Sequence, residues 1–226
     1  MNSYYNDWSF SKEQLTAEEH RIWIGGIWEE QSNLQLNICK KYGLTSESKL
    51  LDFGCGCLRG GVKFIDFLNP GNYFGIDINQ GLLHAGLNYE VPKANLQHKI
   101  VLENFLVSNK FDLDYFNTKF DIILAQSVFN HLPLNHLDYF TKKALKVMNG
   151  DSKIIMSFYF IEEHEDLTED KLFIAENFSI ITSYIFDTYH YKFSQIQTML
   201  SNDWNITLLN DYHPRKQKFI MLTKKT

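Results

Sequence analysis

The stretch between residues 49 and 78 limits the fold of this chain more than any other part of the sequence. A short apolar run, KLLDF (49–53), enters a glycine-rich turn, GCG (54–56). A helical pattern, GVKFIDFLN (61–69), then leads to a second apolar run, YFGIDI (73–78). A strand, a glycine turn, a helix and a second strand within about 30 residues form a βαβ unit with parallel strands. The sequence therefore predicts an α/β fold.

The rest of the chain extends this pattern. Further buried strands are predicted at 105–108, 120–127 and 152–161, with an amphipathic helix at 135–150. Two alternating segments, 204–212 and 217–225, flank an HPRK turn and predict an antiparallel hairpin at the sheet edge. We expect a Rossmann-like, doubly wound, mostly parallel sheet of seven strands, with this antiparallel C-terminal edge hairpin and an N-terminal helical cover.

The 226 residues fit a single α/β domain, residues 1–226. Residues 1–45 are expected to form an N-terminal arm and helical cover, with residues 1–16 as the arm. Gly25-Gly26 interrupts the helix expected after it, and two lysines with Gly43 end that helix. Residues 162–190 form an insertion that the α/β alternation does not require, and we expect it near an acceptor site.

Composition excludes several classes of protein. The formal charge is −5, from 22 basic and 27 acidic residues, which argues against a nucleic-acid binder. Three cysteines do not make a disulfide framework. The N-terminal residues lack the pattern of a signal peptide, and no apolar run approaches the roughly 20 residues of a membrane span. The sequence therefore predicts a cytoplasmic protein that contacts neither membranes nor nucleic acid.

The turn around Cys55 and Cys57 allows three interpretations: a metal site, an ordinary tight turn or a nucleotide-binding turn. A structural zinc site needs four ligands, and no second cysteine pair is present, so we expect no metal. Gly54 and Gly56 allow a sharp turn and leave room for a ligand at the start of the next helix. Asp77 follows Gly56 by 21 residues, which is where dinucleotide folds place an acid for ribose hydroxyls. The alternative for Asp77 is a helix cap.

Asp52 decides which adenosine ligand suits the turn. Its carboxylate precedes the glycines by two positions, where it disfavours an anionic pyrophosphate and favours a ligand with an ammonium and a sulfonium. Here the sequence resembles the class I S-adenosylmethionine-dependent methyltransferases, through LLDFGCG (50–56) and YFGIDI (73–78). With EHRIWIGGIWEEQSNLQ, FDIILAQSVFNHLP and HPRKQ, it resembles one bacterial subgroup that acts on small molecules. Leu58 departs from the family pattern, because many members carry a third glycine there.

The resemblance implies a set of cofactor-binding residues. The turn would line the methionine part of the cofactor. The end of the second strand would contact the ribose and the adenine, and the end of the third strand would contact the adenine. The end of the fourth strand would pass the methionine end, and the N-terminal helix would fold over the cofactor. The residues are Asp52, Gly54, Cys55, Gly56, Asp77, Ile78, Asn109, Phe111, Gln126, Ser127 and Arg21. Trp28 would join Arg21 in the cover or belong to the core.

Three histidines are candidates for a general base or a substrate contact. His131 follows the fourth predicted strand, at the carboxyl edge where α/β proteins bind ligands, although it is also placed to cap the next helix. His213 lies in the hairpin turn, where a purely structural turn residue is the alternative. His190 follows the insertion and is a candidate for the wall of an acceptor pocket. The EEHED run (162–166) is expected to be a solvated loop.

These features predict methyl transfer from S-adenosylmethionine to a small-molecule acceptor, at oxygen or nitrogen, with a sugar or an amine favoured. The sequence after the fourth strand lacks the Asn/Asp-Pro-Pro-Tyr/Phe stretch that grips nucleobase amines, and no Pro-Cys is present. Two alternatives stay open at this point. One is a non-catalytic S-adenosylmethionine-binding module, and the other is an NAD-dependent oxidoreductase.

Overall fold

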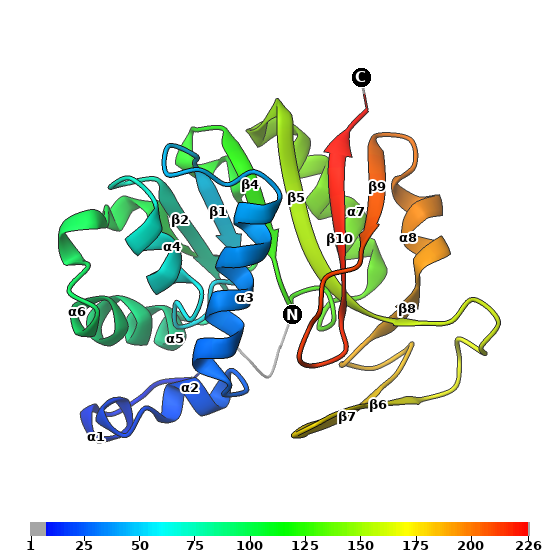
Figure 1. The fold of residues 1–226 in the computed structure, drawn as a ribbon, viewed down its shortest axis with the longest axis horizontal. Helices are drawn as coiled ribbons and strands as arrows, with labels where there is room; N and C mark the ends of the chain where they lie inside the picture. The colour runs from blue at the N-terminus through cyan, green and yellow to red at the C-terminus, as the bar shows by residue number, and fades with distance from the viewer. Residues whose placement is uncertain (1–7, 226) are drawn as a thin grey trace. The chain divides into compact units, whose positions relative to one another are not determined.

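A computed structural model describes residues 8–225 of the chain. The chain forms two compact units that divide between Ile122 and Ile123. The division falls inside strand β4 (Phe120–Ala125), which therefore contributes to both units. We describe each unit by itself (Figure 1).

The first unit contains the predicted βαβ unit. Its strands are β1 (Leu50–Phe53), β2 (Tyr73–Asp77) and β3 (Phe105–Val107). Their order in the sheet is β3-β2-β1, and β4 is the next strand beside β1. β1 pairs in parallel with β2, and β2 in parallel with β3. Every residue of β1 and β2 is buried, which explains why both strands are continuous apolar runs rather than alternating ones.

Helices flank these strands. Helix α4 (Gly61–Phe67) connects β1 to β2, and α5 (Gln80–Ala85) follows β2; both contact β2. A π-helical turn, η1 (Gly86–Glu90), and a short helix, α6 (Val91–Lys93), continue α5. Three 3₁₀ turns complete the unit: η2 (Gln97–Lys99), η3 (Leu102–Asn104) and η4 (Leu113–Phe116).

The N-terminal segment consists of three helices, α1 (Lys12–Thr16), α2 (Glu19–Trp23) and α3 (Trp28–Lys41). The predicted break at Gly25-Gly26 is present, and both glycines have positive φ values, 93° and 64°. The prediction of an irregular arm was wrong for residues 12–16. Ser11 accepts a hydrogen bond from the Gln14 N–H, and Gln14 accepts one from the Ser11 N–H, so a capping box starts a helix there.

The second unit contains the antiparallel part of the sheet. β5 (Met148–Ile161) pairs antiparallel with β10 (Lys218–Lys224), and β10 antiparallel with β9 (Trp204–Leu209). The strand order is β4-β5-β10-β9, and β8 (His190–Lys192) pairs in parallel with the end of β5. The C-terminal edge hairpin predicted from the alternation is therefore confirmed. The helices of this unit are α7 (Leu134–Ala144), the 3₁₀ turn η5 (Leu145–Val147) and α8 (Phe193–Leu200).

One boundary differs from the prediction. The helix expected over 135–150 ends at Val147, and Met148 already belongs to β5. The glycine at 150, which suggested a helix stop, lies in the first part of this long strand. An Asn-Gly-Asp run has low strand propensity, but the exposed end of a long strand tolerates it.

The predicted insertion forms a two-stranded antiparallel ribbon. β6 (Lys171–Ala175) and β7 (Phe178–Thr182) pair only with each other within the described residues. The sheet as predicted, mostly parallel with an antiparallel C-terminal edge, is confirmed; β8, the eighth strand among the described residues, and this ribbon are additions to it. Among residues 8–225, no helix combines the length and the apolar character needed to span a bilayer.

Candidate functional site

The glycine turn after β1 is tied to the end of β2 by its backbone. The N–H groups of Gly54 and Cys55 both donate to the carbonyl of Ile76, at 2.8 and 3.1 Å. Gly54 and Gly56 have φ values of +81° and +54°, a conformation that glycine adopts without strain. The chain thus turns sharply at the carboxyl edge of β1 and β2, where parallel sheets bind ligands.

Asp77 holds this turn through its carboxylate. One oxygen accepts the Gly56 N–H at 2.7 Å, and the other accepts the Asn79 N–H at 2.7 Å. Burial raises the pKa of Asp77, and these N–H donors oppose the shift. Each carboxylate oxygen has a second lone pair, so the group can also accept from a ligand hydroxyl.

Asp77 is not the N-cap of a helix, which was the alternative interpretation of this residue. Asn79 is the N-cap of α5, and its side chain accepts the Leu82 N–H at 2.7 Å. Asp77 ends β2 and lies two residues before the cap. Its carboxylate therefore connects the turn to the start of α5.

Asp52 lies in β1, two residues before Gly54. It is 3% exposed, and its carboxylate accepts a hydrogen bond from the Tyr73 hydroxyl at 2.8 Å. Burial raises the pKa of Asp52 to about 7, although the Tyr73 hydrogen bond lowers it. Asp52 is thus a buried residue of β1, hydrogen-bonded to β2, whose carboxyl group has a pKa near neutral.

Leu58 stands where related turns have a third glycine, and it has the backbone conformation that a glycine would adopt. Its φ is +62°, which is strained for a residue with a side chain. Its side chain is fully buried between two glycines, because a Cβ on Gly61 would lie 2.8 Å from Leu58 Cβ and one on Gly86 2.5 Å from Leu58 Cγ. Leu58 therefore adopts a backbone conformation that glycine favours and adds an apolar anchor.

Arg21 makes ion pairs within the protein. Its Nε and Nη2 donate to the two carboxylate oxygens of Glu90, each at 2.7 Å, and its Nη1 donates to Glu18 at 2.6 Å. The guanidinium also lies over the Trp28 ring, 4.3 Å from its centroid. His20, fully buried, contacts the same Glu90 at 2.5 Å. This arrangement supports Arg21 as an anchor of the N-terminal cover rather than as a cofactor ligand.

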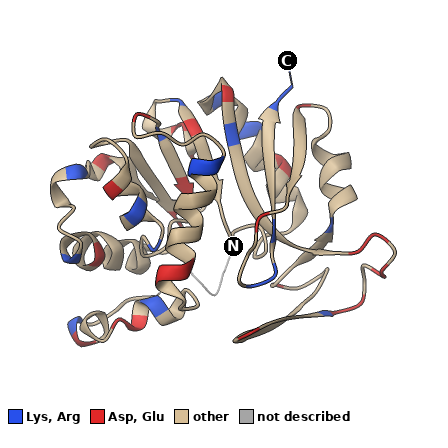
Figure 2. Cartoon of the chain, viewed as in Figure 1, with Lys and Arg blue, Asp and Glu red and all other residues tan. Residues whose placement is uncertain are grey.

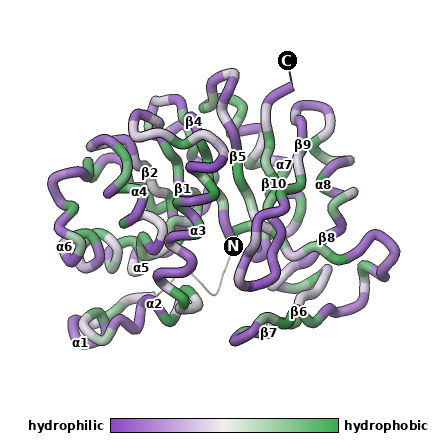
Figure 3. Tube along the Cα trace, viewed as in Figure 1, coloured by the Kyte–Doolittle hydropathy of each residue, from purple (hydrophilic) through white to green (hydrophobic). Residues whose placement is uncertain are grey.

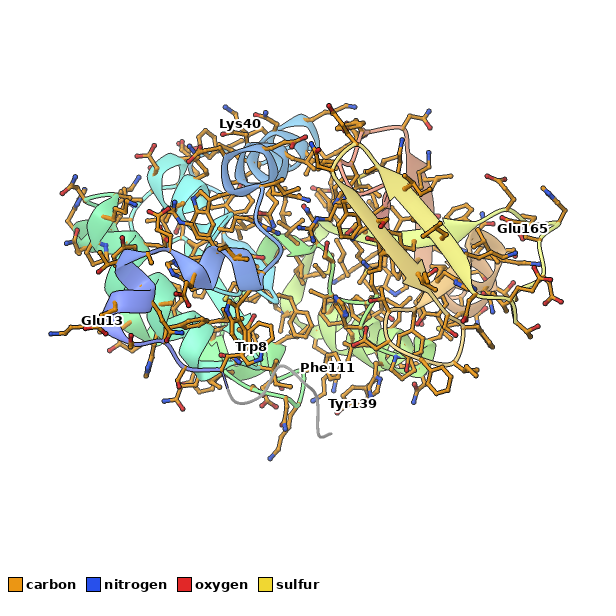
Figure 4. The ribbon with its side chains drawn as sticks, turned by 90° about the horizontal axis from the view of Figure 1, so that it is seen from below. Trp8, Glu13, Lys40, Phe111, Tyr139 and Glu165 are labelled. Carbon is orange, nitrogen blue, oxygen red and sulfur yellow. The ribbon has the colours of Figure 1, made fainter. Side chains whose placement is uncertain are left out.

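The N-terminal cover packs directly on the turn and on α5. Trp8, Phe10, Leu15, Ile24 and Trp28 surround the buried side chains of Cys57, Leu82 and Ala85. A Cβ on Gly56 would lie 3.7 Å from Ile24, and one on Gly81 only 1.7 Å from the carbonyl oxygen of Trp8. Figure 4 views the molecule from below and labels Trp8. The predicted helical cover is present, and its backbone touches the residues that follow Asp77.

Helix α3 has a polar buried face. Gln31, Ser32 and Gln35 are all at most 7% exposed. Among residues 8–225, the buried side-chain oxygen of Gln35 has no hydrogen-bond partner, and it would lie 2.5 Å from a Cβ on Gly60. A buried unsatisfied acceptor is unfavourable by about 1–3 kcal/mol, so this oxygen is suited to a donor from a ligand.

The other predicted residues of the first unit lie around the same edge. Ile78 is half-buried directly after β2, and Asn109 is exposed shortly after β3. Phe111 is buried and stacks on Phe53, with ring centroids 5.5 Å apart. Asn109 thus presents its amide to solvent, whereas Phe111 packs against the last residue of β1.

Gln126 and Ser127 follow β4 and belong to a polar cluster in the second unit. The Ser127 N–H donates to Ser157 Oγ at 2.8 Å, and the hydroxyls of Ser127 and Ser157 both donate to the Gln217 oxygen, at 3.1 and 2.5 Å. Gln126 contacts His213 at 3.2 Å. These side chains come from the residues after β4, from β5 and from the segment before β10, so the fold assembles a largely buried polar network from distant parts of the sequence.

Of the three candidate histidines, His131 has the arrangement of a base. Its Nδ1 lies 2.6 Å from Asp187 Oδ1, and its side chain is 31% exposed. A carboxylate on Nδ1 holds the imidazole in the tautomer that carries its lone pair on Nε2. The alternative role as a helix cap is not realised, because α7 begins at Leu134 after Pro133 without a side-chain cap.

The other two histidines are buried with both ring nitrogens engaged. His190 contacts Thr182 Oγ1 at 2.8 Å and the Leu167 carbonyl at 3.0 Å. His213 Nδ1 accepts the Arg215 N–H at 3.1 Å, and its Nε2 contacts Gln126. These contacts engage both rings within the protein, and a part in catalysis or acceptor binding for either residue stays a prediction.

The cysteines are unsuited to metal binding or nucleophilic chemistry. All three are buried free thiols. Burial raises the pKa of Cys57 to about 12 and that of Cys55 well above its usual range. Within residues 8–225, no three histidine, cysteine or acidic side chains gather in a metal-binding group.

Comparison with solved structures identifies the fold. No protein-family model matches the sequence. The magnesium protoporphyrin IX methyltransferase of Synechocystis PCC 6803, solved with bound SAH, is 13% identical with a TM-score of 0.59, over 98% of this chain and 90% of that one. An S-adenosylmethionine-dependent methyltransferase from Clostridium acetobutylicum is 15% identical with a TM-score of 0.60, over 95% and 99%. A glycopeptide N-methyltransferase complexed with SAH is 9% identical with a TM-score of 0.60, over 86% and 89%.

This chain has the fold of the class I S-adenosylmethionine-dependent methyltransferases. In this methyltransferase fold, the structure shows pairings within each unit that the sequence did not single out. Asp187 pairs with His131 across 56 positions, and Glu90 binds Arg21 across 69. Gln35 lies beside Gly60. No sequence pattern singles out Asp187 or Glu90. Each is one acidic residue outside any motif, and its partner lies far away in the sequence.

Proposed function

We propose that this chain transfers a methyl group from S-adenosylmethionine to a small-molecule acceptor, at an oxygen or a nitrogen. The observation that carries the proposal is the hydrogen bond between the Gly56 N–H and Asp77 at 2.7 Å, within the methyltransferase fold. It joins the glycine turn and the acid at the end of β2, the two features that an adenosine cofactor with a free ribose diol requires.

The residues of the first unit fit such a cofactor. Gly54 and Gly56 leave the turn without side chains, and Asp77 retains lone pairs for two ribose hydroxyls. The buried Gln35 oxygen suits an ammonium donor, and the ionised form of Asp52 favours a positively charged ligand. We propose that Ile78 and Asn109 contact the adenine. Cys55, Gln126 and Ser127 remain proposed contacts of the methionine end.

S-adenosylmethionine would supply a methyl group on a sulfonium; an acceptor lone pair would attack the methyl carbon in line, and S-adenosylhomocysteine would leave. The new carbon–oxygen or carbon–nitrogen bond forms as the carbon–sulfur bond breaks, and the acceptor's proton must leave. We propose that His131 Nε2 takes this proton and that Asp187 positions the ring. The pairing at 2.6 Å and the partial exposure of His131 support this part.

A small molecule is the favoured acceptor. The net charge of −5 disfavours nucleic acid, and the structural neighbours include enzymes named for a porphyrin and a glycopeptide. We propose an acceptor of the sugar or amine class, and a cytoplasmic location.

The cofactor is tested by titrating the purified protein with S-adenosylmethionine, S-adenosylhomocysteine and NAD, followed by calorimetry and melting temperature. The first two should bind, and a ligand at 100 times its Kd should stabilise the fold by about 2.7 kcal/mol. Binding of NAD alone would identify an oxidoreductase instead. Binding of S-adenosylmethionine without turnover on any sugar or amine would favour the non-catalytic module.

Asp77→Ala should weaken S-adenosylhomocysteine binding by about 1.5–3 kcal/mol, because charge-assisted hydrogen bonds are lost. Asp151→Ala, which removes an exposed carboxylate from β5, is the matched control and should bind normally. An unchanged affinity in a folded Asp77→Ala protein would contradict the ribose assignment.

The base is tested with His131→Ala and Asp187→Asn. We expect kcat to fall about 100-fold for the first and about tenfold for the second, with cofactor affinity unchanged. His164→Ala, an exposed histidine of the same unit, is the control. Added imidazole should restore part of the activity of His131→Ala, whereas a merely structural role would give no rescue.

A further inference from the structure

Two segments of the second unit meet at His131. Asp187 contacts the imidazole at 2.6 Å. The Tyr189 N–H donates to the carbonyl of the residue before His131 at 2.6 Å, and the Tyr191 hydroxyl donates to the carbonyl of the residue after it at 2.8 Å. These three contacts hold residues 187–191 against the residues that follow β4.

Three tyrosines gather beside Asp187. The rings of Tyr189 and Tyr191 are nearly parallel, at 16°, with centroids 6.2 Å apart. Tyr184 lies in a loop that the Ser183 N–H closes by donating to the carbonyl of residue 188 at 2.8 Å. Burial raises the pKa of the Tyr191 hydroxyl, and the other two tyrosines and Asp187 raise it further, so all these groups lie close together. We call Tyr184, Tyr189 and Tyr191 the tyrosine cluster.

The tyrosine cluster has a buried base and an open side. Tyr191 is 1% exposed and packs on Phe158, with ring centroids 6.2 Å apart. Tyr189 is half-buried, and Tyr184 is 36% exposed. Two of the three rings are thus accessible to a ligand, and both belong to the segment that contacts His131.

The segment that carries the tyrosine cluster is rich in aromatic residues and poor in cations. Residues 172–191 contain no lysine or arginine and two acids, one of them Asp187. The flanking Lys171 and Lys192 bind oxygen atoms of residues 163–169. Figure 2 shows acids along the loop before β6 and at the β6–β7 turn, and Figure 3 shows the hydrophobic colour along β6 and β7. A cation therefore meets no basic residue of this segment.

The groups nearest the tyrosine cluster favour a positive charge. Those that act on the Tyr191 hydroxyl are two phenols and one carboxylate. Arg215, a cation that contacts the ribbon, lies over the Phe178 ring of β7, 4.7 Å from its centroid. With a neutral imidazole, the His131–Asp187 pair carries one negative charge. The faces of aromatic rings attract cations, and a carboxylate beside them adds to that attraction. An organic ammonium gains from both, and a neutral sugar gains from neither.

We propose that the tyrosine cluster and Asp187 bind an alkylammonium, so that the acceptor is an amine and the methyl group goes to its nitrogen. This inference rests on the proposed methyl transfer and chooses between the amine and the sugar named there. The bound ammonium passes one proton to His131 Nε2, and the nitrogen lone pair then attacks the methyl carbon. The carbon–nitrogen bond forms as the carbon–sulfur bond breaks, and the bonding electron pair leaves with the sulfur of S-adenosylhomocysteine. The product is again an ammonium beside the tyrosine rings.

The experiment is calorimetric titration of the full chain with choline and with 3,3-dimethylbutan-1-ol, at constant ionic strength, with and without S-adenosylhomocysteine. The second probe has a carbon in place of the choline nitrogen, so it has the same shape without the charge. Choline should bind at least about tenfold more tightly, because only the cation is attracted to the ring faces and to Asp187. The anion 3,3-dimethylbutyrate should not bind.

Variants locate the binding. Tyr184→Leu and Tyr189→Leu keep an apolar side chain without the ring, and each should weaken choline binding about three- to tenfold. Tyr189→Phe keeps the ring and should bind choline nearly as well as the natural sequence. Tyr139→Leu, at a 48% exposed tyrosine of α7 whose ring lies 5.7 Å from Lys143 Nζ, is the matched control and should bind choline normally. Circular dichroism should show the same fold in all variants.

Three outcomes would overturn the inference. Choline that does not bind, or that binds no better than the neutral alcohol, would show that the tyrosine cluster does not recognise a cation. Choline binding that neither leucine variant weakens would place the cation elsewhere. A natural sequence that fails to bind S-adenosylhomocysteine would instead contradict the proposed cofactor, and the choline titration without it tests the tyrosine cluster by itself.

Discussion

Gly81 is the position where one added carbon tests the N-terminal cover. It lies in the first turn of α5, and a Cβ there would meet the Trp8 carbonyl oxygen at 1.7 Å and the Trp8 carbonyl carbon at 2.7 Å. Both atoms are backbone, so no side-chain rotation relieves the clash. In Gly81→Ala, either α5 or the segment around Trp8 must move.

The segment around Trp8 is the weaker of the two. Alanine favours α5 by about 1 kcal/mol over glycine. Trp8 and Phe10 are only partly buried, so their release loses about half of the 1.5–3 kcal/mol that full burial of each gives, or roughly 1.5–3 kcal/mol together. We therefore expect Trp8 and Phe10 to leave α5 and the free energy of unfolding to fall by about 0.5–2 kcal/mol.

Tryptophan fluorescence reports this release. Three of the four tryptophans, at positions 8, 23 and 28, lie in the N-terminal segment, and Trp8 and Trp23 are in edge contact at 4.8 Å. The emission of Gly81→Ala should shift to longer wavelength, and limited proteolysis should cleave near Trp8 sooner. Gly150→Ala is the matched control, because a Cβ there meets nothing within 4 Å. If Gly81→Ala matched this control in both assays, the contact between Trp8 and α5 would be refuted.

Two further predictions concern buried charges of the first unit. Asp52 has a pKa of about 7 against about 3.9 in an unfolded chain, so the folded protein holds the proton more tightly and stability falls as pH rises from about 4 to about 7. Asp52→Asn should remove on the order of 3 kcal/mol of that decline, as measured by urea unfolding at pH 4.5 and 7.5; an equal decline in the variant would contradict the assignment. Glu90→Gln leaves the 18% exposed Arg21 without its main carboxylate and should lower the free energy of unfolding by about 2–4 kcal/mol. Glu103→Gln, at an exposed acid, should change it by less than 0.5 kcal/mol in the same urea titration.

Local sequence determined the elements around the turn. The apolar runs and the glycines predicted β1, β2 and the sharp turn after β1. Buried strands require apolar residues and positive φ values favour glycine, so both features can be read from residue type. The apolar run before Asp77, and its spacing of 21 residues from Gly56, also predicted that Asp77 ends β2. The helix over residues 12–16 was missed, although its capping box is a local signal that the sequence contains.

Tertiary structure alone decided which charged and polar side chains meet. Glu90 binds Arg21, which was predicted to fold over the cofactor, and the rings of His190 and His213 contact residues from other segments. His131 was a candidate by position, and only the fold brought Asp187 to its Nδ1. Such pairs join residues many positions apart, and periodicity records which face of an element is buried but not which distant residue it meets. The sequence therefore determined the glycine turn and its acid, and the packing of the chain decided their partners.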